Sequence, residues 1–377
     1  MKICILCFDL SNNSLGRAGL LAMALTSRYK VEIIGPSRSG DIWFPMKDMD
    51  IPIRSYPWKR YPFFISTIRK MIKDIDADIL IACKLRPTSF GIALIKKWVS
   101  NIPVILDIDD WELGFFYHTG FWGKVGRFLN FSNPSGLPYT WLMEYFTGYA
   151  DSTIVSNRFL ENKFSGSLIY HCRDTSKLNP ENFDTDGMKA KLGLEGKRVV
   201  MFLGTPRPHK GTGELFTAME KISDPDIRLV LVGAGSSVQR YMDNMKINQD
   251  KVIAIPKIPF NELPDYLSAA DILAIPQRDT TDTQGQIPAK LFDGMAMAKP
   301  IITTPISDIP EVLGGHGYLI EPGNPEQLAK TIKNIFANPE EARLKGQNAR
   351  KRCQELYDLK VIKKELISKI EKLTTTQ

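Results

Sequence analysis

The chain has 377 residues, of which 43% are hydrophobic and 24% are charged, and its formal net charge is +7. This composition is typical of a globular protein and excludes a disordered chain. The length favours two domains, because single hydrophobic cores stop growing near about 250–300 residues. About five of the net positive charges precede residue 176. This asymmetry indicates an anionic partner for the N-terminal half, either a membrane surface or a phosphorylated ligand, and no nucleic acid is expected.

The first residues, MKICILCFDL, have the lysine and apolar order of a signal peptide, but Asp9 interrupts the run before any small-residue cleavage site. We interpret them as the first strand and expect a cytoplasmic protein. No apolar run has the length of a transmembrane helix. The odd number of cysteines, five, does not indicate a disulfide framework. Cys4 and Cys7 would point to opposite faces of a strand, which favours core packing over a metal site.

In the first half of the chain, strand-like apolar runs alternate with helical patterns. Strands are predicted at 2–10, 30–36, 77–84, 103–110 and 151–157, and helices at 15–28, 62–75 and 88–98. Alternation of this kind predicts right-handed strand-helix-strand units on a parallel sheet, and therefore an α/β, Rossmann-like domain.

Between about 172 and 196 the pattern gives way to a polar segment with proline and glycine, which we expect to be the linker. The alternation then restarts. Strands are predicted at 198–204, 227–235, 252–259, 271–277, 300–305 and 317–322, with helices from 211, near 237–246, near 261–270 and from 325 onward. Two doubly wound domains are expected to leave a cleft between them, and such sheets bind ligands beyond the carboxyl ends of their strands.

The loop GTPRPHKG, residues 204–211, lies between a predicted strand and a helix. Helix N-termini present unpaired backbone N–H groups to anions, and Arg207 and Lys210 add positive charge, so the loop predicts a diphosphate clamp. A solvated basic turn is the alternative. A dinucleotide site is not favoured, because neither SNNSLGRAG after the first strand nor GAGSSV at 233–238 has three glycines at the spacing G-x-G-x-x-G.

The stretch TQGQIPAKLFDGMA, residues 283–296, follows the strand at 271–277. Pro288 suits the first turn of a helix, so Gly285, Gln286 and Ile287 would form the loop before it, with N–H groups free for phosphate or sugar oxygens. Lys290 would reinforce an anion site in the first turn. Asp293 lies one turn later on the predicted buried side, and an ion pair with Lys290 is the alternative reading of both residues.

These segments carry a family resemblance. The succession GTPRPHKG, RLVLVGAG, IPFNELPDYLSAADILAIPQ, PAKLFDGMAMAKPIITT, SDIPEVL and HGYLIEPGNPEQLA resembles the C-terminal half of a GT-B glycosyltransferase of the large retaining family 4, or group 1, type. The N-terminal half is similar through its first glycine loop and the strand PVILDIDDWE. DSTIVSNRFLENKF followed by IYHCRDTSKLNP matches the family's interdomain crossing.

The resemblance implies a GT-B fold, with an acceptor domain at 1–175, a nucleotide-sugar donor domain at 176–355 and a C-terminal helix, 356–377, that packs toward the N-terminal domain. It implies a retaining hexosyltransferase of cell-envelope, polysaccharide or other glycan biosynthesis that needs no metal or other cofactor. A UDP-sugar is favoured because UDP is the commonest donor base among the relatives. A GT-B epimerase or phosphorylase, or a non-catalytic sugar-nucleotide binder, is the alternative.

The resemblance also assigns roles to residues of the donor domain. Lys210 matches the lysine that holds the donor diphosphate, while Thr205 replaces the family's arginine five positions earlier, and Arg207 would supply the missing charge. Asp293 matches the second of two glutamates eight residues apart, which accepts hydrogen bonds from the ribose hydroxyls. The first glutamate, which contacts the transferred sugar, is replaced by Gly285.

Without that side chain, the contact to the donor sugar falls to backbone N–H groups, Gln284 or Gln286.

In the N-terminal domain, Asp109 occupies the position of a family histidine near the transferred sugar, and Asp110 and Glu112 follow it. Three acids at the end of a strand are costly to bury without function, so contacts to sugar or acceptor hydroxyls are expected. Capping of the following helix, or pairing with Arg17, is the structural alternative.

His118 would be a displaced general base or a structural histidine. Gly16 matches the loop through which the backbone approaches the donor phosphates, or is ordinary turn geometry.

Two segments bear on the acceptor. Residues 56–75 interleave aromatic and basic side chains, a mixture that favours an anionic membrane surface, and a core helix with a solvated basic face is the alternative. Residues 115–149 hold 12 aromatic residues and one acid, Glu144. They would line an acceptor cleft or lie on a membrane, because aromatic rings suit both sugars and lipid headgroups, or they would pack in the core. A peripheral location at the inner face of the membrane is therefore expected.

Overall fold

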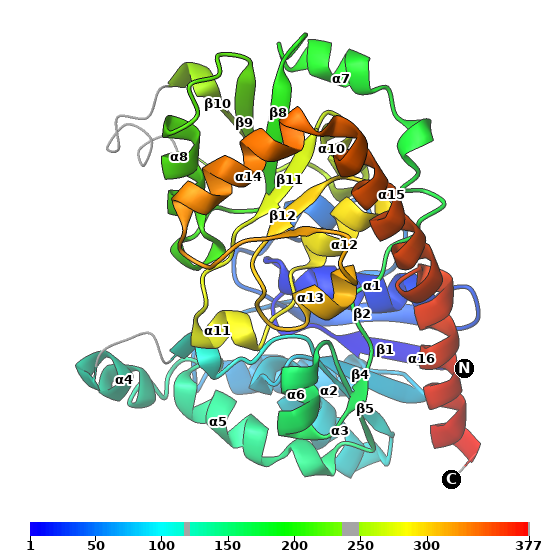
Figure 1. Cartoon of the computed structure of the whole chain (residues 1–377). Helices are drawn as coiled ribbons and strands as arrows, with labels where there is room; N and C mark the ends of the chain where they lie inside the picture. The colour runs from blue at the N-terminus through cyan, green and yellow to red at the C-terminus, as the bar shows by residue number, and fades with distance from the viewer. Residues whose placement is uncertain (117–120, 236–248, 376–377) are drawn as a thin grey trace. The chain divides into compact units, whose positions relative to one another are not determined.

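A computed structural model describes residues 1–116, 121–235 and 249–375 (Figure 1). The helix predicted near 237–246 and the candidate base His118 lie outside these ranges. Contacts divide the chain into two compact units, one made of Met1–His171 with Lys360–Gln377 and the other of Cys172–Leu359. The C-terminal helix α16 (Leu359–Thr375) therefore packs almost wholly with the N-terminal part of the chain.

The first unit is built on a seven-stranded sheet with the strand order β3-β2-β1-β4-β5-β6-β7, and every pairing described in it is parallel. The strands are β1 (Lys2–Leu6), β2 (Lys30–Ser37), β3 (Ile53–Pro57), β4 (Ile79–Cys83), β5 (Val104–Ile108), β6 (Ser152–Val155) and β7 (Ser167–Leu168). The five predicted strands are confirmed. The two edge strands, β3 and β7, were not predicted, because β3 is mostly exposed and β7 is only two residues long.

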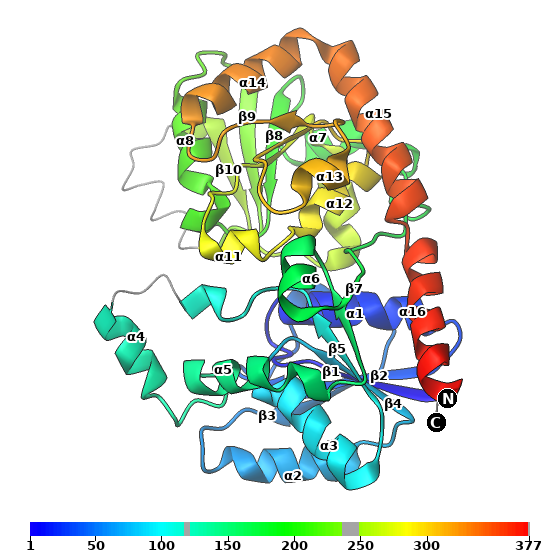
Figure 2. The ribbon, with the colours of Figure 1, turned by 60° about the horizontal axis from the view of Figure 1, so that its bottom comes forward.

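The helices of the first unit include the three that were predicted. They are α1 (Ser14–Leu25), α2 (Phe64–Asp74), α3 (Ile92–Ser100), α4 (Phe121–Phe128), α5 (Leu137–Tyr145) and α6 (Arg158–Phe164), with short turns η1 (Phe44–Met46), η2 (Pro87–Gly91), η3 (Gly114–Phe116) and η4 (Thr147–Tyr149). Buried side chains of α2, α3, α5 and α6 share one hydrophobic core with β1, β4 and β5. These helices therefore cover one face of the sheet, and α1 lies on the other (Figure 2).

The second unit has a six-stranded sheet with the order β10-β9-β8-β11-β12-β13, again with parallel pairing throughout the described strands. Its strands are β8 (Arg198–Leu203), β9 (Ile227–Val232), β10 (Val252–Ile255), β11 (Ile272–Ile275), β12 (Ile301–Thr303) and β13 (Tyr318–Leu319). All six were predicted from their apolar runs.

The helices of the second unit follow the predicted pattern with three additions, α7, α11 and α13. They are α7 (Thr185–Lys191), α8 (Thr212–Glu220), α10 (Leu263–Ser268), α11 (Thr281–Gln284), α12 (Ala289–Ala296), α13 (Ile309–Leu313), α14 (Pro325–Ala337) and α15 (Pro339–Leu356), with turns η5 (Pro180–Asn182), η6 (Pro208–Lys210), η7 (Gln249–Lys251) and η8 (Phe260–Glu262). The segment 172–196, expected to be a linker, belongs to this unit. Asp184 caps α7 there by accepting a hydrogen bond of 2.9 Å from the Gly187 N–H.

Packing of the second unit depends on close helix contacts. Helices α8 and α14 lie side by side and share a core with β8 and β9 that includes Phe202, Phe216 and Ile332. Helix α15 packs on α12, and a Cβ at Gly346 of α15 would lie 2.1 Å from the Ala298 carbonyl oxygen. A side chain at residue 346 would therefore push the two helices apart.

In the part of the chain that the structure describes, no helix has both the length and the apolar character needed to cross a membrane.

A buried ion pair joins three elements of the first unit. Arg17 of α1 lies 2.8 Å from Asp107 of β5 through its Nη2, and both side chains are almost fully buried. The same guanidinium donates to the carbonyls of Ile169 and Tyr170, just after β7, at 3.0 and 3.1 Å. Arg17 therefore holds α1 against β5 and the end of β7.

Replacing Arg17 with methionine should destabilise the first unit by roughly 3–5 kcal/mol, because it leaves the buried Asp107 carboxylate and two carbonyls without their donor. Chemical denaturation followed by circular dichroism measures this loss. Arg28→Met is the matched control, because Arg28 pairs with Glu371 at the surface, where such pairs contribute about 0–1 kcal/mol. Equal effects of the two substitutions would contradict the assigned role of Arg17.

Candidate active site

The two loops predicted to bind the donor lie next to each other. The loop 204–211 follows β8 and the segment 276–288 follows β11, and β8 and β11 are neighbours in the second sheet. The Arg278 N–H donates to the His209 carbonyl at 2.9 Å. Gly211 has φ 71°, and a Cβ there would lie 1.7 Å from the Pro276 carbonyl oxygen. Glycine is thus required for the two loops to meet at the carboxyl edge of the sheet.

Two lysines converge on the end of β8. The Lys210 ammonium donates to the Thr205 carbonyl at 3.2 Å. The Lys290 ammonium, from the first turn of α12, donates to the Leu203 carbonyl at 3.0 Å and lies 3.7 Å from the centroid of the Phe202 ring. The pair of loops therefore brings two cations to carbonyls only two residues apart.

The electrostatics of Lys290 are unusual for a lysine. Burial holds its pKa well below the ordinary value, and the charge of Lys210 lowers it further. Among the described residues no carboxylate offsets these effects on its pKa. An anion placed between the two ammonium groups would relieve both the desolvation and the repulsion.

The other residues of the loop 204–211 lie closer to solvent. Arg207 is exposed, and its carbonyl accepts a hydrogen bond of 3.2 Å from the Thr212 hydroxyl. Thr205 is half-buried and contributes its carbonyl to Lys210. Arg207 is therefore available to an approaching anion from the solvent side of the loop.

The loop 285–287 differs in part from its prediction. Gly285 ends the short helix α11, and the N–H groups of Gly285 and Gln286 both donate to the Thr283 carbonyl. The expectation that these two N–H groups are free is therefore wrong. The cause is α11 itself, which Thr280 and Thr283 stabilise through a reciprocal capping box. Ile287 is buried and anchors the loop, and Pro288 is the residue that precedes α12.

Asp293 has a partner that the sequence did not suggest. Its carboxylate forms a two-pronged pair with Arg173, through Nε to Oδ1 and through Nη2 to Oδ2 at 3.0 Å. Arg173 also donates to the carbonyls of Cys172 and Ala289 at 2.7 and 3.1 Å, and both side chains of the pair are buried. The alternative pairing of Asp293 with Lys290 is wrong, since Lys290 turns to the Leu203 carbonyl instead.

The acids predicted in the first unit form a buried cluster at the ends of β4 and β5. The Lys84 ammonium lies 2.8 Å from Asp109 and 3.1 Å from Glu112, and it also contacts Asp110. Arg86 donates to Glu112 through Nε at 2.8 Å. Lys84 reaches this position from a backbone with φ 73°, a conformation that a lysine rarely adopts.

The cluster sets the protonation of its acids. Burial and the carboxylates of Asp109 and Glu112 raise the pKa of Asp110 to about 6, although Lys84 acts in the opposite direction. Burial likewise raises the pKa of Asp109. Burial also acts to raise the pKa of Glu112, but the charges of Arg86 and Lys84 outweigh it and hold that pKa below the usual range. Asp110 is therefore suited to gain or lose a proton near neutral pH.

Of the two structural alternatives for these acids, pairing with Arg17 is corrected. Arg17 pairs with Asp107, two residues before Asp109, whereas the three predicted acids all contact Lys84 and Glu112 also contacts Arg86. Gly16 lies in the first turn of α1 rather than in the preceding loop.

One buried side chain near the donor loops was missed. Gln277 follows β11, is almost fully buried, and its Oε1 has no hydrogen-bond partner among the described residues. The polar residue after the apolar run 272–276 was the only signal in the sequence. Within the same described ranges, no group of three or more His, Cys, Asp or Glu side chains is arranged to hold a metal ion.

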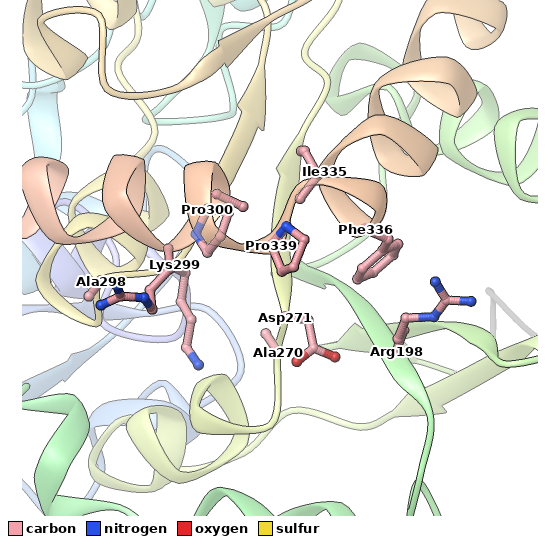
Figure 3. Close-up of a pocket in the computed structure, with 11 residues that line it drawn as sticks. Arg198, Ala270, Asp271, Ala298, Lys299, Pro300, Ile335, Phe336 and Pro339 are labelled. Carbon is pink, nitrogen blue, oxygen red and sulfur yellow. The ribbon is translucent and has the colours of Figure 1, made fainter.

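A cavity of about 390 Å³ lies at the opposite edge of the second sheet, where the strands begin (Figure 3). Arg198 opens β8, Asp271 directly precedes β11 and Pro300 directly precedes β12. The cavity is lined by Arg198, Ala270, Asp271, Ala298, Lys299, Pro300, Ile335, Phe336, Pro339, Ala342 and Arg343. None of the predicted site residues lines it, so it is separate from the candidate active site.

Comparison with known proteins agrees with the geometry. Residues 197–338 match the model of the family described as "Glycosyl transferases group 1". The chain is 25% identical over 243 residues to spore coat protein SA of Bacillus subtilis, which covers 59% of this chain and 63% of that protein. It is 27% identical over 276 residues to the putative teichuronic acid biosynthesis glycosyltransferase TuaC of the same organism, which covers 71% and 64%. The chain thus spans less than two thirds of the length of these relatives.

The fold has close structural counterparts. The Anabaena protein Alr3699/HepE, solved in complex with UDP-glucose, superimposes with a TM-score of 0.77 at 15% identity, over 99% of this chain and 100% of that one. With its two parallel Rossmann-like sheets, the chain has the GT-B fold.

Replacing Asp110 with asparagine should remove part of the pH dependence of folding. A carboxyl whose folded pKa exceeds its unfolded value contributes stability that is present below about pH 4 and is lost as the pH rises through about 6. The unfolding free energy of wild type relative to Asp110→Asn should therefore fall by on the order of 2–3 kcal/mol between about pH 4 and pH 7. Urea unfolding at a series of pH values measures it, with the exposed Asp50→Asn as control. A difference that stays constant with pH would contradict this assignment.

Proposed function

Because residues 197–338 form a domain of the group 1 glycosyltransferases, we propose that this protein transfers a hexosyl group from a nucleotide-diphosphate sugar to an acceptor with retention of configuration. We favour a UDP-sugar as donor. The convergence of Lys210 and Lys290 at the end of β8 carries the proposal. The pKa of Lys290 is lowered by burial and by Lys210, with no carboxylate of the described residues among the causes, so the site favours a ligand with negative charge, and a diphosphate supplies it.

The chemistry follows from where charge develops. When the bond between the sugar and the diphosphate breaks, negative charge accumulates on the leaving diphosphate. Lys210 and Lys290 would stabilise that charge from fixed positions, and Arg207 would approach it from the solvent side of the loop. The proposed reaction needs no metal, because these cations take over the neutralisation of the leaving group.

The remaining donor contacts are assigned from the same edge of the sheet. Thr205 and the loop Gly285, Gln286 and Ile287 would border the phosphates and the transferred sugar. Asp293 would accept hydrogen bonds from the ribose hydroxyls through carboxylate lone pairs that Arg173 leaves open, since each of its oxygens can accept more than one hydrogen bond.

We assign the acceptor to the first unit. The cluster of Asp109, Asp110 and Glu112 would bind acceptor hydroxyls, with Asp110 the most suited to take up a proton. A lipid, polysaccharide or small-molecule acceptor fits this chemistry. A lipid-linked acceptor would bring the enzyme to a membrane, and we propose that residues 56–75 contact an anionic membrane surface there.

Replacing Lys290 with methionine should weaken UDP binding roughly 10–100-fold and lower sugar transfer, because a charge-assisted contact to the diphosphate is lost. Isothermal titration calorimetry with UDP measures the affinity, and release of UDP from UDP-sugars measures turnover. Lys210→Ala should behave in the same way.

Lys299→Met is the matched control for Lys290→Met. Lys299 is also desolvated, with its pKa lowered to about 8 by burial, but it lines the cavity at the opposite edge of the same sheet. UDP affinity should not change in this variant. The proposal fails if no UDP-, GDP- or ADP-sugar binds the wild type or is turned over. Tight donor binding without transfer would instead indicate a non-catalytic sugar-nucleotide binder.

Donor binding should also take up protons. Burial and Lys210 lower the pKa of Lys290 in the free protein, and a bound diphosphate raises it again, so a proton is gained on binding at neutral to alkaline pH. Calorimetry of UDP binding in buffers of different ionisation enthalpy counts these protons. Lys290→Arg should bind UDP without the uptake, since arginine stays protonated. Binding of the wild type with no proton uptake at any pH from about 7 to 9 would contradict the assigned role of Lys290.

A further inference from the structure

Large apolar side chains are concentrated on the surface of the first unit. Most of the exposed ones in the described residues lie between 63 and 149, whereas the second unit contributes only Leu319, Leu344 and Leu356. A monomeric soluble protein seldom exposes a contiguous apolar patch of this kind unless the patch binds something.

Six of these side chains define a ridge on α3, α5 and η4. We call Trp98, Val99, Trp141, Leu142, Tyr145 and Tyr149 the aromatic ridge. Tyr145 is 75% exposed, Val99 71% and Trp98 59%, so the side chains project into solvent rather than into the core. None of these residues lies in the 56–75 segment.

Ring contacts connect three members of the ridge, Trp98, Tyr149 and Tyr145. The rings of Trp98 and Tyr149 meet edge to face with centroids 6.1 Å apart. Phe146 then contacts Tyr149 at 5.7 Å and Tyr145 at 5.9 Å. The end of α3 and the last turns of α5 are thus one aromatic surface.

Helix α2 adds positive charge to the same side of the unit. It packs beside α3 and shares with α3 and α5 the core on one face of the sheet, so its outer side belongs to the same helical layer (Figure 2). Arg69, Lys70 and Lys73 of α2 are exposed on that layer.

The acids near the ridge are already balanced. Glu144 accepts a hydrogen bond of 2.8 Å from the Trp111 indole and pairs with Lys163. Asp151 pairs with Lys97 at 2.7 Å. The layer therefore offers aromatic rings and cations to a partner, and the carboxylates of Glu144 and Asp151 are paired with lysines.

The combination of exposed aromatic rings and cations distinguishes a membrane partner from a protein partner. The core of a protein interface is depleted of lysine, whereas tryptophan and tyrosine beside lysine and arginine are characteristic of the interface between water and an anionic bilayer. We propose that the aromatic ridge inserts into the headgroup region of an anionic membrane, with Arg69, Lys70 and Lys73 against the lipid phosphates. The surface extends the membrane contact proposed for 56–75 to α3, α5 and η4, and its lipid binding requires no sugar donor.

Sedimentation with vesicles of phosphatidylcholine and phosphatidylglycerol tests the proposal with the full chain. Wild type should bind anionic vesicles and bind pure phosphatidylcholine much more weakly. The double variant Trp141→Ser/Tyr145→Ser should lower the partition coefficient roughly tenfold, through lost apolar burial. Arg69→Gln/Lys73→Gln should lower it by about tenfold or more and flatten its dependence on salt, since each cation near a bilayer contributes roughly fivefold.

Leu344→Ser is the matched control, because Leu344 is 54% exposed but lies on α15 of the second unit. This variant should bind anionic vesicles as well as wild type does. Thermal unfolding verifies that each variant is folded. Quenching of tryptophan fluorescence by brominated lipids gives a second readout, expected for wild type and reduced in Trp98→Phe/Trp141→Phe. Absence of binding to anionic vesicles would overturn the proposal. Vesicle binding of Trp141→Ser/Tyr145→Ser equal to that of wild type would also overturn it. A third contradicting outcome is that wild type does not bind lipid but forms a concentration-dependent dimer, which the double variant does not form.

Discussion

A charge that is removed from water must be balanced inside the protein, and this constraint organises the functional edges of both sheets. In the first unit Asp107 is balanced by Arg17, and the acids after β5 are partly balanced by Lys84 and Arg86. In the second unit Asp293 is balanced by Arg173. Each of these pairs joins segments far apart in the chain, so the same contacts that neutralise the charges also fix the loops.

Lys290 is the exception to this balance, and the proposed function rests on it. A carbonyl and an aromatic ring partly solvate its ammonium group, but neither contributes a full negative charge. Lys210 lies on the neighbouring loop and adds a second positive charge. The fold holds the two lysines close together because each lies on a fixed element. Lys210 lies in the loop after β8, and Lys290 lies in the first turn of α12. A ligand that brings negative charge then gains electrostatic energy without reorganising the protein, which is the requirement for stabilising a leaving diphosphate.

The regular elements could be predicted because their signals are local. Apolar runs of strand length identified all six strands of the second sheet and five of the seven strands of the first. The edge strand β3 exposes most of its residues, so its sequence lacks that signal. Helix α11 escaped prediction because four polar residues with a capping box show no apolar period. Candidate residues were found by type and position, but their partners were not, because Arg173 and Asp293 are 120 residues apart and meet only through packing.

The partner of Asp293 changes what the family resemblance implies for the donor site. An aspartate is one methylene shorter than the glutamate that it replaces, and its carboxylate is gripped at both oxygens by a planar guanidinium. Arg173 also donates to the carbonyl of Ala289, the first residue of α12. The ion pair therefore fixes the carboxylate and the start of the helix that carries Lys290 as one rigid body. A nucleotide bound there would meet an acid and a cation whose spacing is set before it arrives. Because Gly285 has no side chain, the proposed donor site would select the sugar through the surrounding backbone and through Gln284 and Gln286 rather than through a second carboxylate.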